Sequence, residues 1–186
     1  MDYGAKLLTG LSYQDFLSTY GTEEQRRRWQ GVHDQVSLTP AQKELLAGFT
    51  REMKVICLAG AWCGDCVNQC PIYDHFAAES NKIVVRYFDR DANPDLGTQL
   101  SVCGGARVPV VLFLSEDNQQ VGFYGDRTLS KYRRMAADQL GAACPTGIIP
   151  EPRDLLAAVT QDWLNEFERV QLILRTSPRL RQLHGD

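Results

Sequence analysis

The feature that most constrains this 186-residue chain is a pair of cysteines, Cys63 and Cys66, separated by two residues in the run WCGDC. An apolar strand pattern over residues 54–59 (KVICLA) comes just before the pair, and a helical pattern over residues 65–79 follows it. A second strand pattern at residues 82–88 completes a strand–helix–strand unit of about 35 residues, the size of one parallel crossover. The spacing therefore places two thiols at a strand-to-helix junction in an α/β fold.

Two thiols at such a junction can carry out thiol–disulfide exchange. The free N–H groups and the dipole at the start of a helix favour an anion, so we expect a lowered pKa for Cys63 and a nucleophilic role for its thiolate. Cys66 lies one helical turn further on, where it can attack the mixed disulfide and release the reduced substrate. This chemistry needs no cofactor beyond the redox-active disulfide that Cys63 and Cys66 form.

Two other interpretations of these thiols stay open. Cys63 and Cys66 could be inert buried cysteines, or they could bind zinc or an iron–sulfur cluster together with Cys70. A zinc site usually needs a second cysteine pair or nearby histidines, and the sequence has no matching knuckle elsewhere. We therefore predict redox chemistry and no metal ligands.

Helices are expected on both sides of the crossover unit. Thr22 with Gln25, and Thr39 with Gln42, have the spacing of capping boxes, so the region from residue 12 to residue 53 is predicted to hold three helices. Near the other end, the expected elements are a helix over residues 129–140 that ends at Gly141, a long helix over 153–175, and a frayed tail, PRLRQLHGD.

The segment between the second strand and residue 129 is expected to complete the sheet. A short helix near residues 96–102 leads to strands at 109–114 and 120–124. Asp117 and Asn118 mark a turn between these two strands, which should pair as an antiparallel hairpin.

Composition argues against several classes of partner. The net charge is −3, and the run Arg26–Arg28 is interpreted as a solvated helix face, so no nucleic acid partner is predicted. No segment approaches the roughly 18 apolar residues that a membrane helix needs, and the N-terminus does not have the pattern of a signal peptide. We therefore expect a cytoplasmic protein with no membrane partner, whose six cysteines serve reactivity or packing rather than structural disulfides.

Several motifs, in the right order, resemble the thioredoxin family. The run WCGDC resembles its active site, and Pro71, five residues after Cys66, resembles the proline inside its active-site helix. The run FDRDANP resembles the segment that follows the family's next strand. Val108 and Pro109 resemble the hydrophobic residue and cis-proline that face the cysteines, and residues 122–125 resemble the final hairpin. Together these features cover about half of the chain.

The resemblance implies a thioredoxin fold, with a central mixed sheet of about four strands flanked by helices. Residues 54–141 would be the core, residues 1–53 an N-terminal helical extension and residues 142–186 a C-terminal loop and helix, all in one compact domain. Such extensions resemble those of larger bacterial thioredoxin-like proteins.

The resemblance also implies which residues contact the substrate. Val108 would offer its backbone to an extended substrate, and Pro109 would keep metals away from the dithiol. Trp62, Gly64 and Asp65 would form the contact surface around the cysteines. Two alternatives are that Trp62 is a core residue and that Pro109 begins an edge strand with a trans peptide bond.

The sequence departs from the family at two positions. Asp65 stands where a typical thioredoxin has proline, and its charge should raise the pKa of Cys63. Cys57 stands where thioredoxins usually have a buried aspartate that assists proton transfer from the resolving thiol. Another group or a water molecule must then serve Cys66, with Asp89 and Asp91 as candidates by proximity.

The remaining chemistry-bearing residues allow two interpretations each. Cys70 and Cys103 could add regulatory disulfides or be incidental thiols, and no role is assigned to Cys144. Arg107, directly before Val108, could bind an anionic substrate or stabilise the Cys63 thiolate, or it could be an exposed loop arginine.

The function predicted from the sequence is that of a thiol–disulfide oxidoreductase acting in cell redox homeostasis. It would reduce disulfide-containing proteins and be recharged by a low-molecular-weight thiol or by a donor of the thioredoxin-reductase type. Two alternatives stay open: a disulfide isomerase or oxidant, and a redox-regulated interaction module that docks a partner on its long C-terminal helix.

Overall fold

The computed structural model describes residues 1–140 and 154–186. Their helices and strands, in chain order, are α1 (Tyr3–Leu7), α2 (Tyr13–Tyr20), α3 (Glu23–His33), α4 (Pro40–Ala47), β1 (Met53–Ala59), α5 (Gly64–Glu79), β2 (Ile83–Asp89), α6 (Pro94–Gln99), β3 (Val110–Leu114), β4 (Gln120–Gly125), α7 (Leu129–Leu140), α8 (Leu155–Thr176) and α9 (Pro178–His184). No helix in the described part of the chain combines the length and the apolar character needed to cross a bilayer.

The strands form one mixed sheet in the order β2-β1-β3-β4. Strand β1 pairs in parallel with β2, and antiparallel with β3, which in turn forms an antiparallel hairpin with β4. The parallel pair of β1 and β2, joined through α5, confirms the predicted crossover, and the pair of β3 and β4 confirms the predicted hairpin. The mixed four-stranded sheet with flanking helices confirms the expected thioredoxin-like fold.

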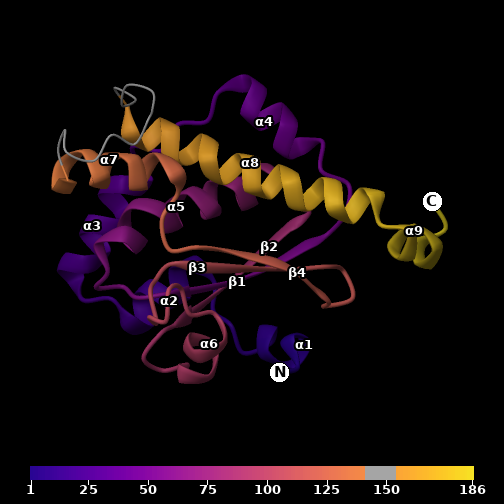
Figure 1. The fold of residues 1–186 in the computed structure, drawn as a ribbon, viewed down its shortest axis with the longest axis horizontal. Coiled ribbons are helices and arrows are strands. Elements are labelled where there is room, and N and C mark those ends of the chain that lie inside the picture. The colour runs from indigo at the N-terminus through magenta and orange to yellow at the C-terminus, as the bar shows by residue number, and fades with distance from the viewer. Residues whose placement is uncertain (141–153) are drawn as a thin grey trace.

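Helices cover the sheet on both sides (Figure 1). Helices α4, α5, α7 and α8 lie on one side, with α5 packed against β2 and α8 against both α5 and β4. Helices α1 and α6 lie on the opposite side in the same view. Because both faces of β1 are covered, its side chains from Val55 to Ala59 are fully buried.

The N-terminal extension also covers one edge of the sheet. Both predicted capping boxes are present, at the starts of α3 and α4. Helix α2 packs against β2, and just before it the N–H of Leu11 donates to the carbonyl of Tyr87 at 3.0 Å. The N–H of Tyr87 donates back to Leu11 at 2.8 Å, so the outer edge of β2 is partly paired.

Both ends of the chain form helices that the sequence analysis did not predict. Helix α1 was not anticipated; it is tied to α6 by a 2.8 Å ion pair between Lys6 and Asp95. The tail is a helix, α9, so the expectation that it frays is wrong. Leu180 is buried in the core, and the carboxylate of Asp186 pairs with the buried guanidinium of Arg51. The Gly141 cap and Cys144 lie outside the described residues.

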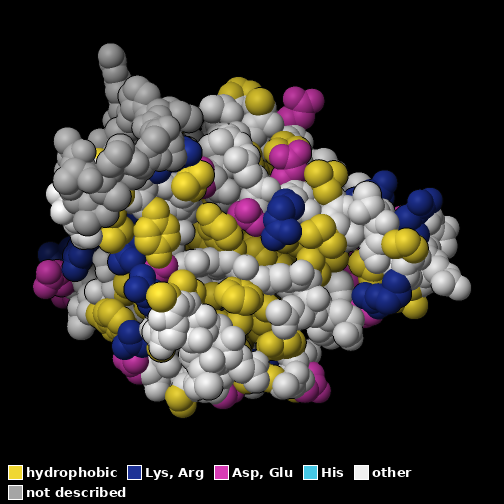
Figure 2. All heavy atoms as spheres, in the orientation of Figure 1, with side chains coloured by type: hydrophobic (Ala, Val, Ile, Leu, Met, Phe, Trp, Pro, Cys, Tyr) yellow, Lys and Arg dark blue, Asp and Glu magenta, His cyan; other side chains and the backbone are white. Residues whose placement is uncertain are grey.

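Strand β4 is the other edge of the sheet and is the most exposed strand. Figure 2 shows apolar side chains gathered over the region of β4 and α8. The large exposed apolar residues of these two elements are Phe123, Leu172 and Ile173.

Candidate active site

The two cysteines of the motif lie where β1 turns into α5. Cys63 is the N-cap residue of α5, and its N–H donates to the carbonyl of Gly60 at 3.0 Å. A side chain at Gly60 would lie 2.7 Å from the ring of Trp62, so a larger residue there would displace that ring. Cys63 is partly exposed whereas Cys66 is fully buried, and both are free thiols. A large substrate can therefore reach only Cys63 of the pair.

A hydrogen bond between the two thiols separates their pKa values. Burial would raise the pKa of Cys66, but hydrogen bonds from the thiols of Cys63 and Cys70 and from the N–H of Gly60 outweigh burial and lower it to about 5. The pKa of Cys63 is raised by its hydrogen bond to Cys66 and by burial, against the lowering effect of the N–H groups of Cys66 and Asp65. The direction at Cys63 is therefore opposite to the expected lowering, because the hydrogen bond to Cys66 and burial outweigh the N–H groups of the first turn.

The loop before β3 faces the dithiol. The peptide bond between Val108 and Pro109 is cis, and the Sγ of Cys63 lies 3.5 Å from the carbonyl oxygen of Val108. The side chain of Val108 is buried. The fold thus brings together two segments 45 residues apart, and main-chain atoms of the Val108 loop lie beside the reachable thiol.

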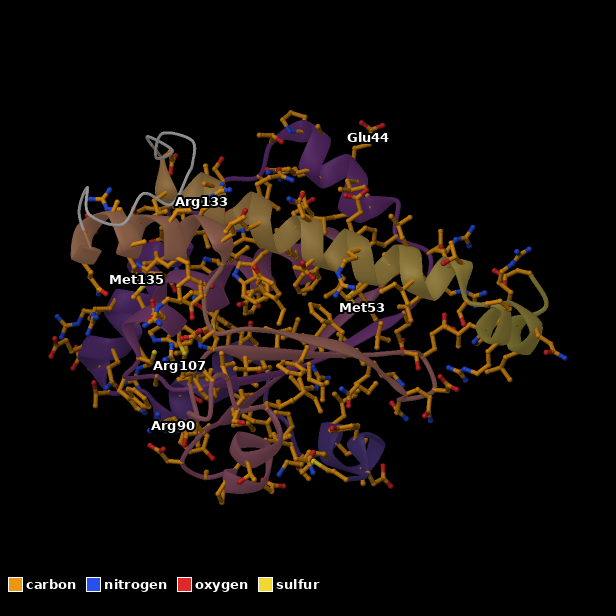
Figure 3. The ribbon with its side chains drawn as sticks, in the orientation of Figure 1. Glu44, Met53, Arg90, Arg107, Arg133 and Met135 are labelled. Atoms are coloured by element: carbon orange, nitrogen blue, oxygen red, sulfur yellow. The ribbon has the colours of Figure 1, made fainter. Side chains whose placement is uncertain are left out.

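Trp62 and two arginines border the site. Trp62 is 43% exposed, so it is not a core residue, and the guanidinium of Arg90 stacks 4.4 Å from its ring centroid. Arg90 also donates to the carbonyl of Ala106 at 3.4 Å, next to Arg107. Figure 3 shows Arg90 and Arg107 at the same end of the molecule. The stack holds an apolar ring at the surface beside Cys63.

The charge of Asp65 is neutralised within the protein. Its carboxylate pairs with Arg127 at 2.5 Å, and Arg127 also pairs with Asp126 at 2.8 Å. Burial would raise the pKa of Asp126, but the hydrogen bond from Tyr132 and the charges of Arg127 and Arg107 outweigh it and lower the pKa. The expected effect of Asp65 on the Cys63 thiol is thus reduced, because Arg127 lies beside the carboxylate.

Arg107 points toward the same network, with its Nη1 3.4 Å from the carboxylate of Asp126, while its side chain is 44% exposed. A role in binding an anionic substrate or the Cys63 thiolate stays a prediction.

The other candidate residues have different environments. Cys57 and Cys70 are fully buried, with their Sγ atoms 3.8 Å apart, whereas Cys103 is exposed. Asp89 accepts hydrogen bonds from the N–H groups of Asp91 and Ala92, both at 3.0 Å, so its carboxylate caps that turn. Within residues 1–140 and 154–186, no three His, Cys, Asp or Glu side chains are placed to hold a metal ion.

A family model for thioredoxin matches residues 10–138, which is more than half of the chain. This chain belongs to the thioredoxin family. No curated protein matches the sequence.

Two solved structures are similar to this chain over nearly its whole length, including the N-terminal and C-terminal extensions. A protein of unknown function from Pseudomonas aeruginosa superposes with a TM-score of 0.70 at 16% identity, covering 91% of this chain and 96% of that one. An HIV epitope-scaffold protein has a TM-score of 0.65 at 17% identity, covering 90% of this chain and 99% of that one. At these identities the likeness concerns the fold alone.

In this thioredoxin-family protein the extensions reach the candidate active site through two buried tryptophans. The indole N–H of Trp29 in α3 donates to the carbonyl of Ala61 at 2.9 Å, two residues before Cys63. The indole N–H of Trp163 in α8 donates to the side chain of Gln69 in α5 at 2.9 Å. The amide of Gln69 then donates to the carbonyl of Asp126 at 3.1 Å.

Sequence reasoning missed most of these supporting residues. Trp29 stands alone as a large apolar residue in a charged helix, RRRWQG, and that contrast predicts burial but no partner. Gln69, Asp126 and Arg127 give no pattern, because their partners come from distant parts of the chain.

Proposed function

We propose that this protein is a thiol–disulfide oxidoreductase that reduces disulfides in proteins, with Cys63 as nucleophile and Cys66 as resolving thiol. The observation that supports this most is the contrast between the two thiols at the start of α5. Cys63 is open to a substrate, while Cys66 behind it is fully buried and has a lowered pKa. Such an arrangement favours intermolecular attack by the first thiol and intramolecular attack by the second.

The proposed reaction uses the shared proton of the pair. The Cys63 thiol gives its proton to the Cys66 thiolate, and the Cys63 sulfur attacks the substrate disulfide, whose second sulfur leaves as a thiolate and takes up a proton. Cys66 then loses its proton and attacks the Cys63 sulfur, and the substrate sulfur bonded to Cys63 leaves as a thiolate and takes up that proton. The Cys63–Cys66 disulfide forms, the mixed disulfide breaks and the substrate leaves with two more electrons.

The surroundings of Cys63 suit an extended polypeptide. The carbonyl of Val108 lies beside the thiol and can accept a main-chain hydrogen bond, and the exposed ring of Trp62 offers an apolar contact. Gly64 and Asp65 follow Cys63 in the first turn of α5 and complete the proposed contact surface. A low-molecular-weight thiol or a reductase would recharge the pair. The cytoplasmic location stays a prediction.

Insulin reduction in the presence of dithiothreitol tests the proposal. The wild-type protein should accelerate the reaction, Cys63→Ser should abolish the acceleration, and Cys103→Ser, which removes the exposed cysteine of another loop, should leave it unchanged. Failure of the wild-type protein to exceed Cys63→Ser on insulin and on small mixed disulfides would contradict the proposal.

The reduction potential of the pair separates a reductase from the two alternatives. Equilibration in graded thiol/disulfide buffers, with mass-tagging of free thiols, should give a reduction potential of about −270 mV for a reductase. A value between about −180 and −120 mV would instead indicate an isomerase or an oxidant. If the pair forms no disulfide at any potential, the interaction-module alternative takes the place of the enzyme.

A further inference from the structure

A second pair of thiols lies in the core behind the active site. Cys57 is in the middle of β1 and Cys70 is in α5, and neither side chain has any solvent exposure. Their Sγ atoms are 3.8 Å apart. A disulfide bond is about 2.05 Å long, so side-chain rotation with a small approach of α5 to β1 would close it.

The buried pair is connected to the active site through Cys66. Cys66 and Cys70 are four residues apart in α5, so their side chains lie on the same face of the helix, one turn apart. Cys63, at the N-cap of the same helix, lies three residues before Cys66, and the thiols of both Cys63 and Cys70 act to lower the pKa of Cys66. Four sulfur atoms therefore form a chain from the surface to the core, in the order Cys63, Cys66, Cys70, Cys57.

We propose that Cys57 and Cys70 are a second redox-active dithiol, which takes up oxidising equivalents from the Cys63–Cys66 disulfide through Cys66. This inference rests on the proposed function, because the active-site disulfide is the oxidant. One fully reduced chain would then hold four electrons and reduce two substrate disulfides before it needs a donor.

Two thiol–disulfide exchanges carry the electrons. In the first, the Cys70 thiol loses its proton and attacks the Cys66 sulfur; the Cys66–Cys70 bond forms, and Cys63 leaves as a thiolate and takes up a proton. In the second, the Cys57 thiol loses its proton and attacks the Cys70 sulfur; the Cys57–Cys70 bond forms, and Cys66 leaves and is protonated. Cys57 and Cys70 lose two electrons and two protons, and the active-site pair gains both.

The first exchange requires a distortion of α5 at a turn where the helix already lacks a main-chain hydrogen bond. Side chains four residues apart on a helix have Cβ atoms about 5–6 Å apart, but a disulfide needs about 4 Å. Pro71, directly after Cys70, has no N–H to donate to the carbonyl of Val67, so this turn of α5 lacks one of its hydrogen bonds. The turn that must tighten therefore has one main-chain hydrogen bond fewer than a regular helical turn.

Burial makes the exchange slow and selective. It raises the pKa of Cys70, so the attacking thiolate is scarce. Because neither sulfur is exposed, an external oxidant can reach the buried pair only through Cys66 while the protein is folded. Oxidation should have a fast phase for Cys63 and Cys66 and a slow phase for the buried pair.

The test counts electrons with 5,5′-dithiobis(2-nitrobenzoate), a small disulfide whose reduced product is coloured. The full chain carries Cys103→Ser and Cys144→Ser, which leaves the four sulfurs of the proposed chain, and it is reduced and freed of reductant. We expect four coloured thiolates per chain, two fast and two slow, with no adduct mass left on the protein. Cys70→Ala should release only the fast two, whereas Cys57→Ala keeps the first exchange and should release at most one more, with one adduct mass on Cys63.

Peptide mapping of the same oxidised protein needs no further substitution. Chymotrypsin cuts after Leu58 and Trp62, and a second protease that cuts before aspartate separates Cys63 from the fragment beginning at Asp65, which should be found linked to the Cys57 peptide. In Cys66→Ala, folded by circular dichroism, Cys57 and Cys70 should stay reduced.

The outcomes distinguish this inference from the function on which it rests. Two coloured thiolates from the four-cysteine protein, with only Cys63 and Cys66 linked, would overturn the inference and leave the proposed function intact. A Cys57–Cys70 disulfide that forms equally fast in Cys66→Ala would overturn the route through Cys66. Absence of any Cys63–Cys66 disulfide would contradict the proposed function itself.

Discussion

The helices before the sheet and the long helix after it both reach the candidate active site, but they contact it in different ways. Trp29 donates to a main-chain carbonyl in the loop that carries Cys63, at Ala61. Trp163 donates to a side chain, Gln69, which passes the connection on to the carbonyl of Asp126. The N-terminal contact therefore fixes one loop, whereas the C-terminal contact joins α8, α5 and the end of the β4 strand.

The two contacts depend on different numbers of side chains. A main-chain carbonyl is present whatever residue stands at position 61, so the Trp29 contact depends on one indole alone. The Trp163 contact depends on Gln69 as well, because the same amide group accepts one hydrogen bond and donates another. Loss of Trp29 should therefore affect mainly the loop that carries Cys63, whereas the effect of losing Trp163 should depend on Gln69 as well.

The largest expected effect comes from removing either indole. Trp29→Ala and Trp163→Ala should each lower the free energy of unfolding by roughly 3–5 kcal/mol, because both side chains are fully buried. Denaturant unfolding measures the change. The third tryptophan, Trp62, is 43% exposed and is the matched control, with an expected loss under about 1 kcal/mol for Trp62→Ala. Equal losses at all three positions would contradict the described burial.

Replacing each indole by a phenyl ring should separate the two contacts. Trp29→Phe and Trp163→Phe keep most of the apolar packing but leave a buried acceptor unpaired, at a cost of roughly 1–3 kcal/mol each. Trp29→Phe should also lower kcat/KM for insulin reduction by roughly tenfold, because the Ala61 loop positions Cys63. For Trp163→Phe the loss should be smaller, and the reverse order would show that the catalytic loop does not depend on Trp29.

Double-mutant cycles should sharpen the contrast further. Gln69→Leu combined with Trp163→Phe should be non-additive by about 1 kcal/mol or more, because the two side chains share a hydrogen bond. Gln69→Leu combined with Trp29→Phe should be additive within about 0.5 kcal/mol. Additivity in the first cycle would mean that Gln69 does not transmit the Trp163 contact.

The thiol pair held between these contacts should show a strong pH dependence. Absorbance at 240 nm should detect one thiolate with a midpoint near pH 5, absent in Cys66→Ser. An unfolded cysteine keeps its proton up to about pH 8.5, so between pH 5 and that value the unfolded chain binds the proton that the folded pair has lost. Stability should therefore rise with pH across this window and fall as the pH drops toward 5. A midpoint near pH 8.5 would contradict the hydrogen-bonded pair.

The smallest expected effect concerns the ion pair beside Asp126, where the C-terminal contact ends. Arg127→Gln leaves the Asp65 carboxylate without its partner, and the pKa of the Cys66 thiolate should rise by roughly 0.5–1 unit, because a nearby like charge disfavours a thiolate. Asp65→Asn should shift it slightly in the opposite direction. The same absorbance titration measures both, and shifts of equal sign would show that charge is not the cause.

Much of the fold could be predicted because its determinants are local. Two capping boxes fixed the starts of α3 and α4, and the apolar runs at residues 54–59 and 82–88 predicted the parallel pair. Helix α9 was missed because its stability is not local: Arg51 and Leu180 hold it only once the core has formed.

The sequence by itself determined the dithiol and its place at a strand-to-helix junction, because spacing and periodicity act over a few residues. Only the tertiary structure decided what surrounds that dithiol. Trp29 meets Ala61, Arg127 takes up the charge of Asp65, and Cys70 comes to lie against Cys57. Contacts of this kind join residues that are far apart in the chain or on different elements, and they depend on where the packed core places each side chain.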